Sequence, residues 1–410
     1  MIDARLIDAA TTPYAPLIGA ATLMRCAFRN ENLRPIGEML LARTQAHPDD
    51  ANAWLDASWV LQLIGQREAG LEVQHQALAT RSLYVLPAPA LPAALKLLVL
   101  MGPGDFMANT PIEFLLESTA IAAQVQYLTM DLPLPEQVPD HDVLFCAIAQ
   151  CDANVPLLRD VAQMLDGWPR PVVNRPERVA HLSRDGACAK LAGAAGTVMP
   201  PTLRVERAVA GQLAAGSLDP ASMFDGAGFP LIVRPIDSHA GHDLLKVEDA
   251  AALRAYLARQ PSDGFYLAPF IDYAGQDGQF RKYRIVLIEG VAYICHLAIS
   301  SHWMVHYLNA GMDDDAGKRL EEAREMAGFD AGFATRHAAA LADIDARIGL
   351  PYLGIDCAET RDGRLLIFEV DNAMVVHAMD DPAKYPYKRP MMDKVFTAFA
   401  AMLRRAAGKG

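Results

Sequence analysis

The sequence predicts a multidomain chain that mixes α-helix with parallel and antiparallel β-structure. At 410 residues the chain is too long for one ordinary hydrophobic core, so two or three domains are expected. Helical patterns fill about the first 90 residues, and strands alternate with helices from about residue 94. Beyond about residue 174 the chain is rich in strands joined by turn signals. We therefore expect a helical segment over 1–92, a small parallel α/β domain over 93–173 and a region of antiparallel sheets over 174–410.

The composition is that of a globular protein, since 52% of the residues are hydrophobic and 21% are charged. The formal net charge of −12 argues against a binder of nucleic acid or of anionic membranes, although a local basic patch could still hold a phosphate. The six cysteines are scattered without CxxC spacing, which predicts reduced thiols in a cytoplasmic protein. No signal peptide is visible, and prolines and a lysine interrupt the longest apolar run, residues 83–101, so no membrane span is expected.

The helical segment contains a helix–turn–helix pattern at 52–79. Four of its residues fall on tetratricopeptide-like spacings: Trp54, Ala57, Leu61 and Ala77. Gly70 departs from the pattern, because that repeat usually has alanine there. At most two such units fit, which is too few for a long solenoid. We expect this segment to bind a peptide, or to cover a neighbouring domain or a second copy of the chain.

The next region has the strand–helix alternation of a parallel α/β domain. Its predicted strands are 95–101, 125–129, 142–149 and 171–174, and its predicted helices are 111–117 and 155–165. The Gly-x-Gly at 102–104 is too short for a dinucleotide-binding fingerprint, so it predicts only a turn.

The C-terminal region begins with a predicted helix at 185–194 and ends with an amphipathic helix at 391–405. Between them we predict strands at 229–235, 243–247 and 264–270, a long hairpin at 280–300, helices at 318–327 and 338–348, and a second hairpin at 351–372.

The second hairpin carries an unusual group of acids. Glu369 and Asp371 are two apart on a strand, so their side chains point the same way about 7 Å apart. If the hairpin closes symmetrically about Asp362-Gly363, Asp356 lies opposite Glu369, and Gly354 lies opposite Asp371. Repulsion among three carboxylates is relieved by a hard cation, which predicts Mg²⁺ with Asp356, Glu369 and Asp371 as ligands. The alternative is an acidic, solvated strand end without metal.

Four features in order resemble the ATP-grasp superfamily: a strand that ends in a basic residue before proline, a small-residue loop, a strand that carries arginine, and an acidic hairpin. The resemblance covers about residues 174–400 and is strongest to carboxylate–amine ligases, such as D-alanine–D-alanine ligase and the glutamate ligases that modify peptides. It implies a two-lobed ATP-grasp domain at 174–410, preceded by a pre-ATP-grasp α/β domain at 93–173.

The resemblance implies roles for particular residues. Arg234 and Arg284 would contact the nucleotide phosphates, Arg284 facing the phosphate that is transferred, and Asp356, Glu369 and Asp371 would hold one or two Mg²⁺ ions. The implied phosphate loop consists of Ser238, His239, Ala240 and Gly241. The implied adenine and ribose contacts are Leu267, Ala268, Phe270, Ile271 and Asp272.

The chain departs from the family at three of these places. Arg234 replaces a lysine, and Asp371 replaces an asparagine. Gly186 stands where the family often has a lysine, and Lys190, one helical turn later on the same face, is the candidate to replace it.

Substrate contacts are expected among basic residues near the implied site: Arg281, Lys282, His302, His306 and His377. The spacing of the histidines fits no zinc-finger or zincin pattern. Without the family resemblance, Arg284 could equally be an exposed salt-bridge partner.

The sequence therefore predicts an ATP- and Mg²⁺-dependent ligase that joins a carboxylate to an amine on a small molecule or peptide, through an acyl-phosphate. One alternative is an ATP-grasp phosphotransferase, which stops after moving the phosphate. The other is a non-catalytic nucleotide-binding scaffold whose helical segment binds a protein or peptide.

Overall fold

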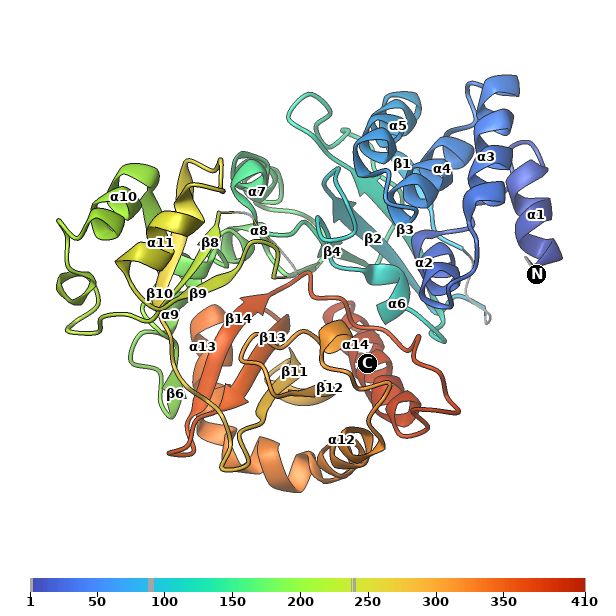
Figure 1. The fold of residues 1–410 in the computed structure, drawn as a ribbon. Helices are drawn as coiled ribbons and strands as arrows, with labels where there is room; N and C mark the ends of the chain where they lie inside the picture. The colour runs from blue at the N-terminus through green and yellow to red at the C-terminus, as the bar shows by residue number, and fades with distance from the viewer. Residues whose placement is uncertain (1–2, 88–91, 237, 239–240, 410) are drawn as a thin grey trace. The chain divides into compact units, whose positions relative to one another are not determined.

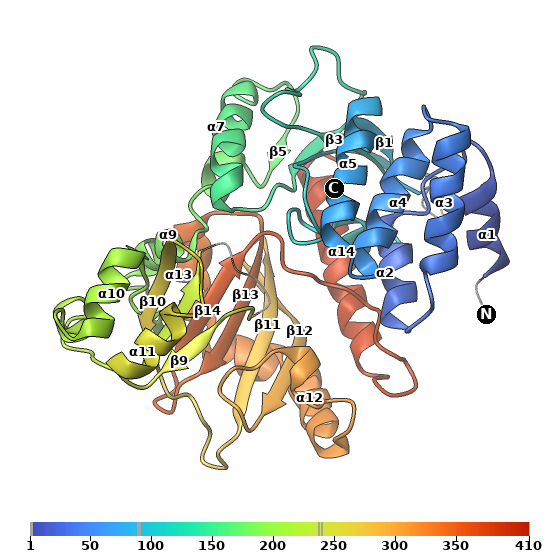
Figure 2. The ribbon, with the colours of Figure 1, turned by 45° about the horizontal axis from the view of Figure 1, so that its top comes forward.

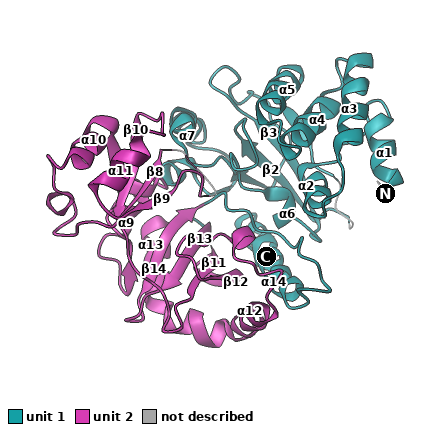
Figure 3. Cartoon of the chain, in the orientation of Figure 1, with its two compact units in different colours: residues 1–180, 350–352, 372–410 teal, residues 181–349, 353–371 magenta. Residues whose placement is uncertain are grey.

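The chain forms two compact units (Figure 3). The computed structural model of the protein describes residues 3–87, 92–236, 238 and 241–409. Unit 1 comprises residues 1–180, 350–352 and 372–410, and unit 2 comprises residues 181–349 and 353–371. The chain therefore passes from one unit to the other after residues 180, 349, 352 and 371. The three predicted domain ranges stay a prediction.

Helices open the described part of unit 1: α1 (Ala4–Thr11), α2 (Ala20–Phe28), α3 (Arg34–Ala46), α4 (Ala51–Leu63) and α5 (Arg67–Thr80) (Figure 1). Asp50 caps α4 by accepting a hydrogen bond from the backbone N–H of Ala53. α4 and α5 form the predicted helix–turn–helix and pack closely. A Cβ at Gly70 would lie 2.8 Å from the Ser58 carbonyl oxygen, so this pair of helices requires glycine where alanine is usual. The tetratricopeptide assignment stays a prediction.

A five-stranded sheet follows in unit 1, in the order β1-β3-β2-β4-β5. Its strands are β1 (Leu83–Val85), β2 (Leu95–Met101), β3 (Ile121–Tyr127), β4 (Val143–Cys146) and β5 (Val172–Val173). β2, β3, β4 and β5 are parallel, as the strand–helix alternation predicts. β1 pairs antiparallel with β3 at the edge, which was not predicted. Short helices accompany the sheet: α6 (Ile112–Leu115), η1 (Asp152–Asn154), α7 (Val155–Met164) and α8 (Pro176–Val179).

The C-terminal helix α14 (Lys388–Ala406) belongs to unit 1 and buries an apolar face there. The ring of Phe399 lies 5.6 Å from that of Phe145 on β4 and 5.3 Å from that of Tyr352. No helix within the described residues combines the length and the apolar character that crossing a membrane requires.

Unit 2 contains two sheets. The first is antiparallel, in the order β7-β10-β8-β9, with strands β7 (Leu203–Glu206), β8 (Leu231–Pro235), β9 (Leu245–Val247) and β10 (Gly264–Pro269). Helices α10 (Arg207–Ala215) and α11 (Ala250–Leu257) pack on it around one apolar core, and η2 (Pro220–Ser222) follows α10.

The second sheet has the order β12-β11-β13-β14-β6, and Figure 2 shows its four long strands side by side. The strands are β6 (Thr197–Val198), β11 (Phe280–Ile288), β12 (Val291–Ser300), β13 (Tyr352–Glu359) and β14 (Leu365–Asp371). The remaining helical elements of unit 2 are α9 (Arg184–Leu191), η3 (Tyr307–Asn309), α12 (Ala316–Gly328), η4 (Asp330–Ala334) and α13 (Ala338–Ile348). The predicted mixture of parallel and antiparallel α/β structure is confirmed.

The acidic hairpin pairs as predicted at its far end but not near its turn. Asp356 lies opposite Glu369, and Gly354 lies opposite Asp371. Nearer the turn, Cys357 lies opposite Ile367, so Phe368 is an extra residue that forms a β-bulge. The predicted symmetric closure about Asp362-Gly363 is therefore wrong at the turn. A five-residue connection, 360–364, shifts the ladder by one residue, and the bulge shifts it back.

Candidate functional site

Asp356 on β13 is surrounded by cations from the neighbouring strand β11. Arg284 donates from Nε and Nη2 to the two oxygens of Asp356 at 2.8 and 3.0 Å. Lys282 Nζ lies 2.7 Å from Oδ2 of the same carboxylate. Lys282 and Arg284 are two apart on β11, so their side chains project from the same face of the sheet toward β13.

These contacts keep Asp356 ionised although it is only 2% exposed. Burial alone would raise the pKa of Asp356, but the charges and hydrogen bonds of Arg284 and Lys282 hold that pKa well below its usual range. The same pairing raises the pKa of Arg284 against the effect of burial. Asp356 and Arg284 are therefore charged at any physiological pH.

Glu369 on β14 is paired with a cation that the sequence did not single out. Arg184, at the start of α9, donates from Nη2 to Glu369 Oε1 at 2.7 Å and from Nη1 to the Phe368 carbonyl at 3.4 Å. Burial and the charge of Asp356 act to raise the pKa of Glu369, but Arg184, followed by Arg234, lowers it below its ordinary value.

The first turn of α9 accounts for the missing lysine at position 186. Ser183 caps the helix, with its Oγ accepting from the backbone N–H of Gly186 at 3.2 Å. A Cβ at Gly186 would lie 2.7 Å from both the His181 carbonyl oxygen and Ser183 Oγ, so no side chain fits there. Lys190 is exposed, and its carbonyl accepts a hydrogen bond from Arg347.

Arg234 is the second-to-last residue of β8, before Pro235 as predicted, and is buried at 7% exposure. Its Nε donates to Ser238 Oγ at 3.0 Å, and its Nη2 donates to the Ser238 carbonyl. Burial, and then the positive charge of Arg184, lower the pKa of Arg234 to about 10, which still leaves the guanidinium charged. Of the predicted phosphate loop, Ser238 thus contacts Arg234, and Gly241 has a positive φ of 75°. His239 and Ala240 lie outside the described residues.

These side chains form what we call the charged cluster, which lies in unit 2: Arg184, Arg234, Lys282, Arg284, Asp356 and Glu369. Four cations stand against two carboxylates. Since unpaired charge is costly away from water, this formal excess of positive charge favours an anionic ligand.

The strand predicted at 264–270 forms β10, and its adenine-contacting role stays a prediction. Leu267 is buried in β10 opposite Val233 of β8, and Ala268 follows it in the same ladder. Phe270 stacks under Lys246, whose Nζ lies 4.2 Å from the ring centre. The two predicted residues that follow β10 contact other groups instead of the charged cluster. Ile271 packs in a small apolar group, and Asp272 is paired with Arg361 at 3.0 Å.

Of the residues predicted to contact substrate, some belong to the charged cluster and others pair with residues outside it. Lys282 belongs to the charged cluster, whereas Arg281 is paired with Asp277 at 2.8 Å and with Glu321. The pKa of His306 is lowered by burial and by the charges of Lys282 and Arg284.

Two further histidines were predicted to contact substrate. Nδ1 of His302 accepts from the backbone N–H of Met304 at 3.2 Å. His377 lies in unit 1, with its ring 5.6 Å from that of Phe28 and 6.2 Å from that of Phe114.

The donor chemistry of the acids fits a hard cation, although each carboxylate already has a cationic partner. A carboxylate offers about four lone-pair sites. Asp356 uses three of them to accept from nitrogen atoms, and Glu369 accepts from Arg184. Both carboxylates therefore keep lone pairs that could bind a metal ion. Asp371 is half-buried opposite Gly354. Across the described ranges, no three His, Cys, Asp or Glu side chains are gathered closely enough to hold a metal ion. The magnesium site stays a prediction.

No protein-family model matches the chain. Among solved structures, it is similar to an ATP-grasp RimK domain protein from Sphaerobacter thermophilus, with 16% identity and a TM-score of 0.44 over 75% of this chain and 99% of that one. A D-alanine–D-alanine ligase from Bacillus anthracis, complexed with ATP, matches at 14% identity and a TM-score of 0.44 over 77% of this chain and 98% of that one. The VanG D-Ala:D-Ser ligase from Enterococcus faecalis matches at 15% identity and a TM-score of 0.45, over 77% of this chain and 99% of that one. This resemblance is one of fold alone.

Proposed function

We propose that the charged cluster binds the phosphates of ATP, and that the protein is an ATP-dependent ligase that joins a carboxylate to an amine. The observation that carries the proposal is the excess of cations over carboxylates in the cluster. An oligophosphate matches that excess, and guanidinium groups suit it because they donate two parallel hydrogen bonds to phosphate oxygens.

The cations would act by neutralising charge as it spreads over phosphate oxygens. Arg284 and Lys282 are held in place by Asp356, and Arg184 by Glu369, so they need little rearrangement when the nucleotide binds. Arg234 would contact phosphate next to the loop that contains Ser238. Asp356, Glu369 and Asp371 would hold one or two Mg²⁺ ions, which would supply further neutralisation of phosphate charge.

The reaction that this arrangement would serve has two steps. An oxygen of the substrate carboxylate attacks the γ-phosphorus of ATP, and ADP leaves with the electrons of the broken P–O bond. The amine nitrogen then attacks the acyl carbon, the bond from carbon to the phosphate oxygen breaks, and inorganic phosphate leaves while the nitrogen loses a proton to solvent. Exclusion of water between the steps would protect the acyl-phosphate.

The test begins with a screen of ADP release by the full chain with ATP and Mg²⁺ against amino acids, dipeptides and short peptides. A product lighter by one water than its two substrates supports ligation. A stable phosphorylated product would establish the phosphotransferase instead. No ATP-dependent rise in melting temperature, with no ADP release, would favour the scaffold.

Glu369→Gln then tests the cluster itself, and we expect it to abolish ADP release while the circular dichroism spectrum stays native. Glu359→Gln is the matched control, because Glu359 lies on the same hairpin but is paired with Arg336 and His337. Unchanged ADP release in Glu369→Gln would overturn the proposal.

A further inference from the structure

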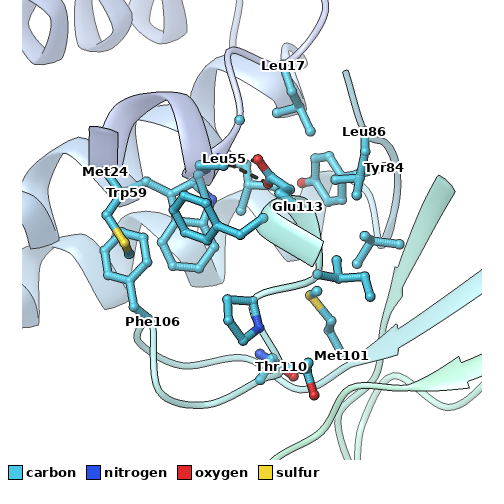
Figure 4. Close-up of a pocket in the computed structure, with 18 of the residues that line it drawn as sticks. Leu17, Met24, Leu55, Trp59, Tyr84, Leu86, Met101, Phe106, Thr110 and Glu113 are labelled. Carbon is cyan, nitrogen blue, oxygen red and sulfur yellow. Dashed lines mark hydrogen bonds between the residues drawn. The ribbon is translucent and has the colours of Figure 1, made fainter. Parts of the chain in front are cut away.

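Unit 1 contains a pocket that the proposed ligase chemistry does not use. It encloses about 60 Å³ between α2, α4, the sheet and α6 (Figure 4). Trp59, Phe106 and Met24 line one side, Tyr84 and Leu86 line the other, and Glu113 lies between them (Figure 4).

The walls are mostly apolar and aromatic. The rings of Trp59 and Phe106 lie 4.8 Å apart, and those of Tyr84 and Tyr127 lie 5.9 Å apart, edge to face. One water, which is a single non-hydrogen atom, needs roughly 10–15 Å³ of cavity volume. The pocket therefore has room for about four or five non-hydrogen atoms. A ligand of that size would be a short alkyl group with one polar end.

Two carboxylates in the pocket wall are fixed by the N-terminus of α2. Asp56 accepts from the backbone N–H groups of Ile18 at 2.8 Å and Gly19 at 3.1 Å. Glu113 accepts from Ala20 at 3.1 Å and Ala21 at 2.9 Å, and Figure 4 shows this side chain reaching toward α2. Neither carboxylate forms an ion pair with an arginine or lysine of the described chain, although Asp56 is only 1% exposed. Buried carboxylates usually have a cationic partner, whereas these two accept only backbone N–H groups among the described residues.

Tyr127 supplies a second, independent indication of a ligand. This residue lines the pocket at 3% exposure, and its hydroxyl forms no hydrogen bond with any residue that the structure describes. A hydroxyl without a protein partner in an apolar pocket offers its oxygen to a ligand that can donate a hydrogen bond.

The charged side chains that line the pocket favour a ligand of positive charge. Its ionisable side chains include the acids Asp56, Asp105 and Glu113, and among the described residues no lysine or arginine lines it. Asp105 is already paired with Arg67 at 2.9 Å. An anion would be repelled, whereas a cation would meet both carboxylates and aromatic rings that attract positive charge.

We propose that this pocket binds a small alkyl amine in its ammonium form. The alkyl group would lie against Trp59, Phe106 and Leu86, and the ammonium N–H groups would donate to Glu113, Asp56 and the Tyr127 oxygen. The amine site goes beyond the ligase proposal and does not depend on it, because its lining residues belong to unit 1 and the charged cluster belongs to unit 2.

The test compares three probes of one shape by ligand-observed NMR with the full chain at pH 7 and without nucleotide. Isobutylammonium should bind at least about tenfold more tightly than neutral isobutanol, as expected for a charge-assisted contact, and isobutyrate should not bind. Equal binding of all three probes, or no binding of isobutylammonium, would overturn the proposal. Because nucleotide is absent, a failed ligase assay leaves this result unaffected.

Variants locate the site. Tyr127→Phe should weaken isobutylammonium binding about tenfold without loss of melting temperature, since the hydroxyl that it removes has no partner in the described part of the chain. Leu86→Trp should abolish binding by filling the pocket. Val85→Trp, on the exposed neighbouring position of the same edge, should leave binding unchanged. Binding that survives both Tyr127→Phe and Leu86→Trp would place the amine elsewhere and refute the site.

Discussion

Asp356 is the residue on which the charged cluster depends for stability. It pairs with Arg284 and Lys282 at once, and all three side chains are mostly buried. Removing one member of a buried ion pair is far more costly than removing an exposed one, because the remaining charges keep their desolvation cost.

We therefore expect Asp356→Asn to lower the free energy of unfolding by about 3 kcal/mol in equilibrium urea titrations. The matched control is Asp362→Asn, since Asp362 pairs with Arg364 at a similar distance, 2.7 Å, but both side chains are more than half exposed. The control should cost far less, because water and salt screen an exposed ion pair. Equal losses in the two variants would mean that the Asp356 pairs are not a buried network.

Arg184 and Lys190 are the two basic residues of α9 that could replace the absent lysine at position 186. Arg184 is paired with Glu369 inside the charged cluster, whereas Lys190 is exposed. We expect Arg184→Met to weaken binding of the ATP analogue AMP-PNP at least about tenfold in isothermal titration calorimetry, and Lys190→Met to change it less than about twofold. The reverse order of effects would assign the missing cation to Lys190.

Asp56 is expected to give unit 1 a pH dependence of its own. The pKa of Asp56 is raised to about 7, mainly by burial and also by the charge of Glu113, against the lowering effect of backbone N–H groups just before α2 and of Arg43. A carboxyl that holds its proton more tightly when folded stabilises the fold at low pH, and this contribution is lost as pH rises from about 4 through 7.

The wild-type protein should therefore lose stability relative to Asp56→Asn between pH 5 and pH 7, by at most about 1.4 kcal/mol per pH unit. Urea unfolding of both proteins at pH 5, 6 and 7 measures the difference, from which other titrating groups cancel. A difference that stays constant with pH would contradict the raised pKa.

The first turn of α9 is the element that places Arg184. Gly186→Ala should destabilise the protein by about 1–3 kcal/mol and weaken AMP-PNP binding, because the added Cβ meets the His181 carbonyl oxygen at 2.7 Å. Gly211→Ala is the control within α10, where a Cβ would meet nothing within 4 Å. It should stabilise the protein by up to about 1 kcal/mol, as alanine does in a helix interior. Thermal unfolding compares the two, and a stabilised Gly186→Ala would refute the close contact.

The acidic hairpin shows which part of a strand register can be predicted from sequence and which part cannot. Strand patterns and the Asp362-Gly363 turn signal were enough to place Asp356 opposite Glu369, but the agreement depends on a bulge at Phe368 that cancels a shift at the turn. A bulge has no composition signal in this strand, so the sequence could not distinguish the two routes to the same register.

Arg184 was missed for a different reason. The sequence Ser183-Arg184-Asp185 is typical of a helix start, and its partner Glu369 is 185 residues away. A single sequence contains no signal for such a distant pair. The amine pocket is equally invisible, because its lining comes from short segments between Leu17 and Tyr127 that only the fold brings together.

At the scale of the whole molecule, neither unit is one continuous stretch of chain. Unit 1 takes its last helix, α14, from residues that follow the acidic hairpin of unit 2. That helix contributes the buried apolar side chains of Met392, Val395, Phe396, Phe399, Met402 and Leu403. At about 1.5–3 kcal/mol for each large side chain, their burial matches the whole stability of a typical domain, about 5–15 kcal/mol.

Residues 1–180 expressed alone should therefore fail to fold, although they contain the complete first sheet. Without α14, Phe145 on β4 loses its contact with Phe399, and the apolar side of the sheet stays in water. We expect poor solubility and a collapsed amide NMR spectrum. The matched control joins residues 1–180 to residues 372–410 through a Gly/Ser linker, which restores α14 and should give dispersed amide signals with cooperative urea unfolding. A dispersed spectrum from residues 1–180 alone would show that the sheet does not need α14, and poor dispersion from both would show that unit 1 depends on unit 2.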